Sequence, residues 1–421
     1  MRNLKRIVAG ASALALAGTL GACSADDGVP TLTWYINPDD GGQAEIAASC
    51  TEAADGAYRI ETSLLPRDAA SQREQLARRL AASDRSLDIM SLDPPFIPEL
   101  AEPGFLAPVP DDLQNTDGIV EGAVQSASWN GELVTVPFWA NTQLLWYRKS
   151  VAEAAGLDMT QPVTWDQIIQ AAEDQNKQLG VQGALAESLT VWINALVASG
   201  GGKILEDPEA KPDEMQLGLE SDAGKKAAEI IGRIGSSGLG GAGLPTADEN
   251  ASMNLFQGDN GSFMVNWPFV YPAMQGAAPE IVDDLGWAVY PRVDAGTPAA
   301  PPVGGINLGV GAYSEHVDLA WQAVQCIVTP ENQAQYFVTN GNPPSNLAAY
   351  DDAEVNEKFP MASTIAESLQ LGAPRPQTPY YNEISIGLQR TWHPPNAVTP
   401  DTTPQTSTDF ILAVLRGERL L

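Results

Sequence analysis

Histidine, cysteine and basic residues are scarce in this sequence. Its 421 residues include 2 His, 3 Cys and 23 Lys or Arg, against 53 Asp or Glu, and the formal net charge is -30. Two histidines leave little material for a histidine-rich metal site or a proton relay. Phosphate backbones and anionic lipid surfaces are bound mainly through Lys and Arg. The acidic excess therefore argues against a nucleic-acid partner and against a polybasic contact with a membrane.

The short motifs of several enzyme and metal-site families are also missing. The chain contains no GxSxG, no Walker lysine loop, no HExxH and no CxxC. Gly238–Gly243 matches GxGxxG formally, but it follows a predicted helix rather than a strand, and we interpret it as a loop. The sequence thus predicts no catalytic residue, no cofactor and no metal.

The chain does contain enough apolar material for large hydrophobic cores. Hydrophobic residues make up 44% of the sequence, which includes 10 Trp, 10 Tyr and 9 Phe. A single core usually serves up to roughly 250–300 residues. A chain of 421 residues therefore predicts two lobes or domains.

The N-terminus has the three parts of a bacterial secretory signal. A basic start precedes an apolar stretch over 7–20, and the segment ends Leu-Gly-Ala-Cys23, which resembles a lipobox. We expect a signal peptide over 1–22 and, over 23–30, a lipidated Cys23 (bearing acyl chains such as palmitate) followed by a polar tether. The alternative is an ordinary cleaved signal with an incidental cysteine. Because no later stretch is long and apolar enough to span a bilayer, we expect membrane attachment through the lipid alone, on the extracytoplasmic face of the cell membrane.

Two cysteines remain after Cys23 is assigned to lipid. An even pair in an oxidising compartment favours a disulfide between Cys50 and Cys326, with two free thiols as the alternative. No neighbouring Cys or His has the spacing that would complete a zinc site.

The first part of the mature chain has an alternating α/β pattern. β-rich runs over 31–36, 58–65 and 87–92 alternate with helical patterns over 43–54 and 69–83. Such alternation predicts an α/β fold with helices flanking a largely parallel sheet. Ligand crevices of these sheets lie beyond the carboxyl ends of the strands. The residues that follow the first and third runs are thus expected near a binding site.

Two later helices are predicted from their capping signals. Ser150 and Glu153, followed by Gly156, fit a capping box and a helix stop. Thr164 and Gln167 fit a second capping box.

Several segments resemble a known family. Trp146–Leu157, followed by Pro162–Asp166, resembles a signature of the extracellular solute-binding proteins of sugar ABC importers, which are similar to maltose-binding protein. Phe256–Gly258 with Met264 and Trp267 resembles a second signature of that family. The resemblance covers essentially the whole mature chain. Three further segments resemble the LpqY-type trehalose-binding lipoproteins of actinobacteria: Trp34–Gly42, Pro137–Gln143 and Ala373–Tyr381.

The resemblance implies a periplasmic-binding-protein fold with two α/β lobes, each a mostly parallel sheet flanked by helices, and a hinge between them. It places the N-terminal lobe at 31–138 and 304–328, and the C-terminal lobe at 139–303 and 329–421. Both Cys50 and Cys326 then lie in the N-terminal lobe. The implied partners are a disaccharide ligand, an ABC permease and its ATPase subunits, and the chain is expected to be a monomer.

A disaccharide pocket needs carboxylates and amides for the sugar hydroxyls and an aromatic face for the C–H patches. Maltose, another glucoside or a glycerophosphodiester remains an alternative ligand to trehalose, and a secreted glycoside hydrolase is the alternative function, because paired carboxylates with Trp also suit that chemistry. Carried over by matching position, the expected ligand-binding residues are Asp93, Asn141, Glu249, Trp267, Arg375, Gly305, Gln43, Asn37 and Tyr271. Asp93 and Glu249 are expected to accept from hydroxyls, Arg375 to donate and Trp267 to stack. Trp139 and Tyr381 are possible secondary walls.

Overall fold

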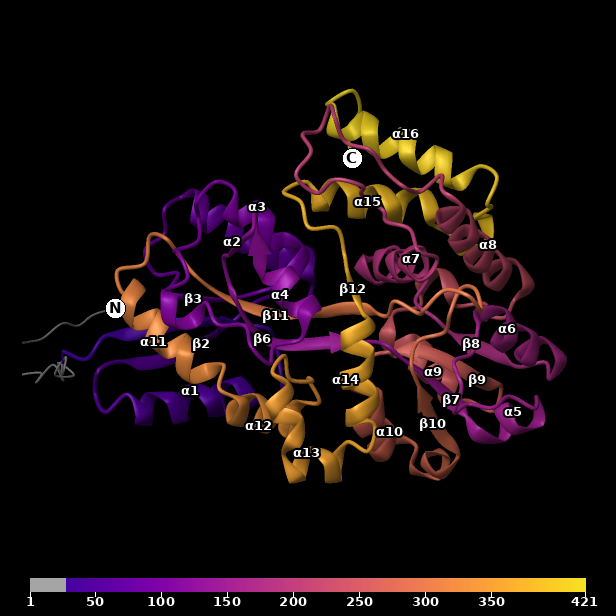
Figure 1. Ribbon diagram of the computed structural model, residues 1–421, viewed down its shortest axis with the longest axis horizontal. Helices are drawn as coiled ribbons and strands as arrows, with labels where there is room; N and C mark the ends of the chain where they lie inside the picture. The colour runs from indigo at the N-terminus through magenta and orange to yellow at the C-terminus, as the bar shows by residue number, and fades with distance from the viewer. Residues whose placement is uncertain (1–27) are drawn as a thin grey trace, which may run out of the picture.

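Two β-sheets, each covered by helices, form two lobes side by side (Figure 1). The computed structural model describes residues 28–421, so the predicted signal peptide and Cys23 lie outside the described residues. Within this described part, the first lobe holds a six-stranded sheet and the second lobe a four-stranded sheet. The two-lobed α/β fold expected from the sequence is confirmed.

The strands of the first sheet are β1 (Thr31–Ile36), β2 (Arg59–Leu64), β3 (Ile89–Leu92), β6 (Val136–Thr142), β11 (Pro302–Val310) and β12 (Ala373–Pro374). Their order is β12-β11-β3-β1-β2, and β6 also pairs with β11. The second sheet has the order β10-β7-β9-β8 and contains β7 (Leu144–Arg148), β8 (Gln178–Gly180), β9 (Gly261–Asn266) and β10 (Leu285–Ala288). A small hairpin pairs β4 (Ser128–Trp129) with β5 (Glu132–Leu133).

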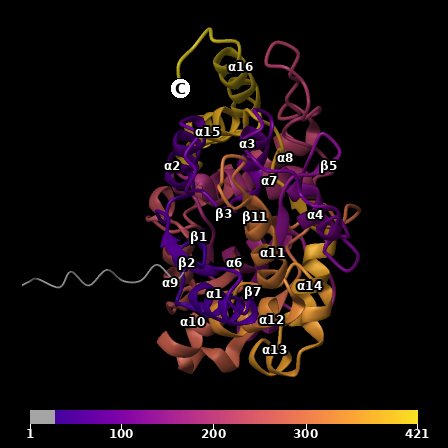
Figure 2. The ribbon, with the colours of Figure 1, turned by 90° about the vertical axis from the view of Figure 1, so that its left-hand side faces the viewer.

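The first sheet is buried on both faces because alternate residues of a strand point to opposite sides. On β1, Trp34 packs with helices α1 and α11, whereas Tyr35 packs with α2 and α3. Figure 2 views the molecule from the side of this lobe. Its helices are α1 (Gly42–Ala53), α2 (Ala69–Ala81), α3 (Ile97–Ala101) and α11 (Val317–Ile327).

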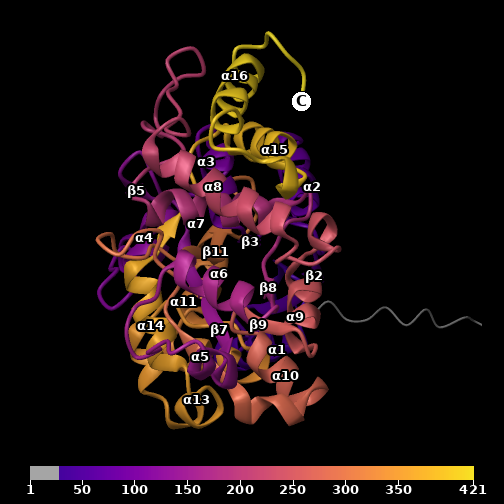
Figure 3. The same cartoon turned by 90° about the vertical axis from the view of Figure 1, so that its right-hand side faces the viewer.

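The second sheet is covered in the same way. On β7, Leu145 packs with α6, α7 and α8, whereas Trp146 packs with α9, α10 and α12. Figure 3 views the molecule from this side. The helices of the second lobe are α5 (Lys149–Ala154), α6 (Trp165–Asp174), α7 (Glu187–Ser199), α8 (Asp222–Ser237), α9 (Glu249–Gln257), α10 (Val270–Ala277), α15 (Tyr381–Trp392) and α16 (Thr403–Leu415).

A third group of helices packs where the two lobes meet. Residues of this group share a hydrophobic cluster with Ala140 of β6 and Leu144 of β7, one from each sheet. The group comprises α4 (Glu121–Ala127), α12 (Pro330–Asn340), α13 (Ala353–Lys358) and α14 (Ala362–Leu371). Single 3-10 turns complete the fold at Pro94–Phe96, Asp111–Leu113, Leu244–Thr246, Pro279–Asp284, Leu347–Asp351 and Pro395–Ala397.

The second sheet departs from the mostly parallel arrangement expected for each lobe. β1 is parallel to both β2 and β3, but β7 is antiparallel to both of its neighbours, β9 and β10. β7 follows β6 after the single residue Gln143 and carries the chain directly from one sheet into the other, whereas its partners β9 and β10 come more than 100 residues later. Their direction relative to β7 is therefore set by the tertiary fold and not by a local connection.

The predicted capping boxes have different outcomes. Thr164 and Gln167 form the expected reciprocal box at the start of α6. The box predicted for Ser150 and Glu153 is wrong: the N-cap residue of α5 is Arg148, two residues earlier, and both the backbone N–H and the hydroxyl of Ser150 donate to Asp284, each at 2.7 Å. A carboxylate 134 positions away in the chain thus replaces the local partner.

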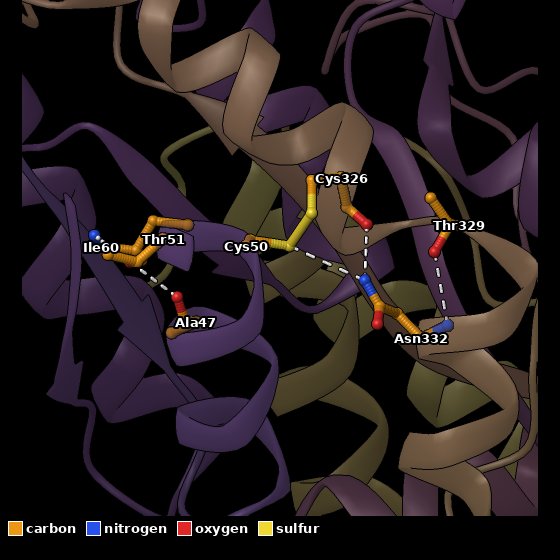
Figure 4. The surroundings of a disulfide bond; sticks show 7 residues. All are labelled: Ala47, Cys50, Thr51, Ile60, Cys326, Thr329 and Asn332. Carbon is orange, nitrogen blue, oxygen red and sulfur yellow. Dashed lines mark hydrogen bonds between the residues drawn. A yellow bond between two sulfur atoms is a disulfide. The ribbon is translucent and has the colours of Figure 1, made fainter. Parts of the chain in front are cut away.

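The predicted disulfide is confirmed. Cys50 on α1 and Cys326 on α11 are joined with an S–S distance of 2.06 Å (Figure 4). Both helices pack on the same face of the first sheet, so the cross-link lies within one lobe. Across residues 28–421, none of the helices has the length and apolar character to cross a membrane.

Candidate ligand-binding site

A cavity of about 410 Å³ lies between the two lobes. The connections after β1 and β3 contribute to its wall from the first lobe, and the starts of α7 and α9 contribute from the second. Its floor is formed by the long strands β6 and β11. Seven of the nine predicted site residues line it, namely Asn37, Asp93, Asn141, Glu249, Trp267, Gly305 and Arg375.

Arg375 is the best-anchored side chain in this wall. Its guanidinium donates to Asp93 Oδ1 from one terminal nitrogen and to Glu187 Oε1 from the other, both at 2.7 Å. The side chain is only 7% exposed, so both ion pairs are largely shielded from solvent. The positively charged donor predicted at this position is therefore already engaged by two carboxylates.

Trp267 lies against the backbone of the floor. A Cβ added to Gly304 would meet the far edge of the indole ring at 3.3 Å, so any other residue there would crowd the ring. The next residue, Gly305, has φ +119°, and a Cβ would meet the Trp139 carbonyl oxygen at 2.1 Å. Gly304 thus lets the aromatic ring approach β11 closely, and Gly305 lets β11 approach the backbone of β6.

Glu249 is the first residue of α9 and follows the capping residue Asp248. Burial raises the pKa of the Glu249 carboxyl, and the negative charge of Asp248 acts in the same direction. The buried Asn266 side chain ties this helix start to β9 by donating to the Glu249 carbonyl at 2.9 Å. This bond fixes the backbone at Glu249, whose side chain lines the cavity.

The predicted amides have mainly local roles in this arrangement. Asn37 donates to Gln72 at 3.0 Å, and Asn141 accepts from the backbone N–H of Thr142, also at 3.0 Å. Gln43 is fully buried and donates to the Asn37 carbonyl at 2.9 Å. It therefore supports a residue of the cavity wall but does not line the cavity itself. Tyr271 is likewise outside the cavity lining, where its ring packs edge-on against Trp287.

Some wall residues carry polar atoms that the protein leaves unpaired. The buried Asn37 Oδ1, Trp139 Nε1 and Ser188 Oγ have no hydrogen-bond partner among the described residues. An unpaired buried polar group costs about 1–3 kcal/mol. A small rearrangement that turns these groups toward a hydroxylated ligand would therefore be favourable.

Sequence patterns did not identify Glu187, a charged residue of the cavity wall that forms an ion pair with the predicted site residue Arg375. Glu187 begins α7. Nothing in its local sequence marks it, since its partners Arg375, Tyr381 and Ser385 lie 188 to 198 positions away. The packing of α7 against α15 brings Tyr381 and Ser385 to Glu187 (Figure 1), and Arg375 reaches it from the segment after β12.

Comparison with known proteins identifies the family to which this chain belongs. A model of the bacterial extracellular solute-binding proteins matches residues 58–334. The chain belongs to this family. A Deinococcus radiodurans protein named "Probable ABC transporter-binding protein" is 26% identical over 341 residues, covering 76% of this chain and 78% of that protein.

The fold of this solute-binding protein is similar to that of two solved structures. The maltose-bound T. maritima MalE3 has a TM-score of 0.76 at 24% identity and covers 93% of this chain and 100% of that one. A ribitol complex of an ABC transporter solute-binding protein from Agrobacterium radiobacter has a TM-score of 0.74 at 20% identity, with 93% and 99% covered. The chain is thus a bacterial extracellular solute-binding protein whose fold is similar to that of these two structures.

Proposed function

We propose that this solute-binding protein captures a neutral, polyhydroxylated ligand, with trehalose as the specific candidate, and delivers it to an ABC permease and its ATPase subunits. The observation that carries the proposal is the composition of the cleft. The indole of Trp267 lies next to Gly304, and the carboxyls of Asp93 and Glu249 line the same cavity from the two lobes. Such a cavity suits a ligand with flat C–H faces and hydroxyl groups.

The charge of the cleft favours an uncharged ligand. Five carboxylates and two guanidinium groups belong to the lining: Asp68, Asp93, Glu187, Asp248 and Glu249 against Arg67 and Arg375. Arg375 is already paired with two of these acids. A glycerophosphodiester would therefore bring its negative charge into an acidic cavity, which makes it a weaker candidate than a sugar.

The size of the cavity and the ligands of structural neighbours support the same class. A volume of about 410 Å³ falls within the range of small-molecule sites. The two neighbours described above hold maltose and ribitol. Maltose is therefore the first alternative ligand to trehalose, and a polyol the second.

Calorimetric titration of the purified protein tests the proposal. Trehalose, maltose, sucrose, ribitol and the anionic diester glycerophosphoglycerol are compared at one pH and salt concentration. We expect heat and a rise in unfolding temperature with trehalose, and neither with glycerophosphoglycerol. If maltose or ribitol binds and trehalose does not, that compound would replace trehalose as the proposed ligand. If none of the four uncharged compounds binds, the proposed ligand class is wrong.

We propose further that Cys23 carries the lipid anchor and that the protein acts as a monomer at the outer face of the membrane. We also propose that the lobes comprise 31–138 with 304–328 and 139–303 with 329–421, with the end of β6, the start of β11 and the short β12 extending from the second lobe into the first sheet. The lipobox-like segment supports the anchor. Detergent-phase partitioning and intact-mass analysis of the wild type and Cys23→Ala test it. A wild-type protein without added acyl mass would refute the anchor.

A further inference from the structure

The interlobe ion pairs form a chain of contacts with one end in each lobe. Asp93 follows β3 of the first lobe, and Glu187 opens α7 of the second. The Arg375 guanidinium lies between them and donates to both carboxylates at 2.7 Å. A single buried cation therefore links two carboxylates that the chain path places on opposite sides of the cleft.

Glu187 is held rigidly at the second-lobe end of this link. Its Oε1 accepts from the Tyr381 hydroxyl as well as from Arg375, and its Oε2 accepts from the Ser385 hydroxyl at 2.6 Å. The Ser385 hydroxyl is itself within 2.9 Å of the Thr190 hydroxyl, one turn along α7. Three donors thus fix one carboxylate at the start of a helix, where the helix dipole also favours negative charge.

Glu187 also supports a second contact with the first lobe. The Tyr381 ring, whose hydroxyl is bound to Glu187, packs edge-on against Phe96 with centroids 5.3 Å apart. Phe96 belongs to the 3-10 turn directly after Asp93. Burial raises the pKa of the Tyr381 hydroxyl, and the charge of Glu187 acts in the same direction, so the hydroxyl stays protonated as a donor.

We propose that Glu187 is a positioning residue that holds Arg375 and Tyr381 against the first lobe and thereby sets how readily the two lobes close. The inference rests on the two-lobed receptor but not on the identity of its ligand. Arg375 without Glu187 loses one of its two carboxylates, and Tyr381 loses its acceptor. Both contacts with the first lobe should then weaken together, although the Glu187 carboxylate is bonded to Arg375, Tyr381 and Ser385 and not directly to Asp93 or Phe96.

The test measures the open and closed populations without any ligand. Spin labels are attached to Glu61→Cys on β2 and Glu153→Cys on α5, one exposed position in each lobe. Pulsed dipolar spectroscopy then compares Glu187→Gln with Glu220→Gln, an exposed second-lobe glutamate that controls for the change in charge. We expect Glu187→Gln to lower the closed-to-open ratio at least fivefold and Glu220→Gln to leave it within twofold of wild type.

A double-mutant cycle separates positioning from a merely structural role. In an Asp93→Asn background, the link has lost its charged first-lobe end, so the effect of Glu187→Gln should fall below twofold. Tyr381→Phe keeps the ring but removes the hydroxyl, and should lower the closed-to-open ratio by less than Glu187→Gln does. This variant also tests the proposal if Glu187→Gln does not fold. A wild type with only the long label distance would overturn the proposal, and so would an equal Glu187→Gln effect in both backgrounds. Failure of trehalose to bind would leave these distances unaffected and would count only against the proposed ligand.

Discussion

Removal of the Cys50–Cys326 bond should destabilise the first lobe while leaving the cleft intact. The bond closes a loop with a sequence separation of 276. In the chain-entropy treatment of disulfides, a loop of that length corresponds to about 5–6 kcal/mol at 25 °C, and native disulfides typically contribute about 2–5 kcal/mol. We therefore expect Cys50→Ala with Cys326→Ala to lower the free energy of unfolding by at least about 2 kcal/mol, measured by urea titration with tryptophan fluorescence.

Chemical reduction provides the matched control. Reduced wild type keeps both sulfur atoms in the core, so its loss of stability reports the cross-link without the cavity that the alanines create. Because α1 and α11 pack on one face of one sheet, the ligand affinity of both forms should stay within threefold of the oxidised protein. A loss of stability below about 1 kcal/mol would refute the loop-closure argument, and a large loss of affinity would show that the bond does more than brace one lobe.

Three further changes have defined outcomes. Trp267→Ala should weaken binding of the ligand found by calorimetry by about 1–3 kcal/mol, because an aromatic face is lost; unchanged affinity in a folded variant would remove this residue from the site. Burial raises the Glu249 carboxyl pKa, so the stability linked to its protonated form is present below its ordinary pKa and is lost as the pH rises through the raised value. Glu249→Gln should therefore melt higher than wild type at pH 7 but not at pH 4, and equal differences at both pH values would contradict the burial argument. Thr164→Ala should cost about 1 kcal/mol through loss of the α6 capping box and leave affinity unchanged; a normal melting temperature would refute the cap's contribution.

Local sequence patterns predicted the elements whose signals are local. The run over 31–36 is β1, and the Thr164 box opens α6 where it was expected. Ser150 shows the limit of such reasoning, because its hydroxyl had a plausible partner three residues away but binds Asp284 instead. A serine hydroxyl that could form a capping box can instead bind any carboxylate that the fold brings close. The local sequence does not show which distant carboxylate that will be.

The predictions for the candidate site show the same difference between local signals and contacts that only the fold creates. Of the residues predicted to bind the ligand, Asp93, Trp267 and Arg375 line one cavity, whereas Gln43 and Tyr271 do not. Gln43 lies on α1 but is turned into the core and donates to a carbonyl. One-dimensional patterns identify the element that carries a side chain more readily than the direction in which packing turns it.

The sequence by itself determined the acidic character, the two-lobe size, the alternating α/β start and the even number of internal cysteines, because each depends on composition, chain length or short-range periodicity. Tertiary structure alone decided that β7 enters its sheet antiparallel to both neighbours and that Arg375 lies between Asp93 and Glu187. These features arise where segments separated by more than 100 residues meet. The free energy of such contacts depends on burial and on the exact neighbours that folding supplies.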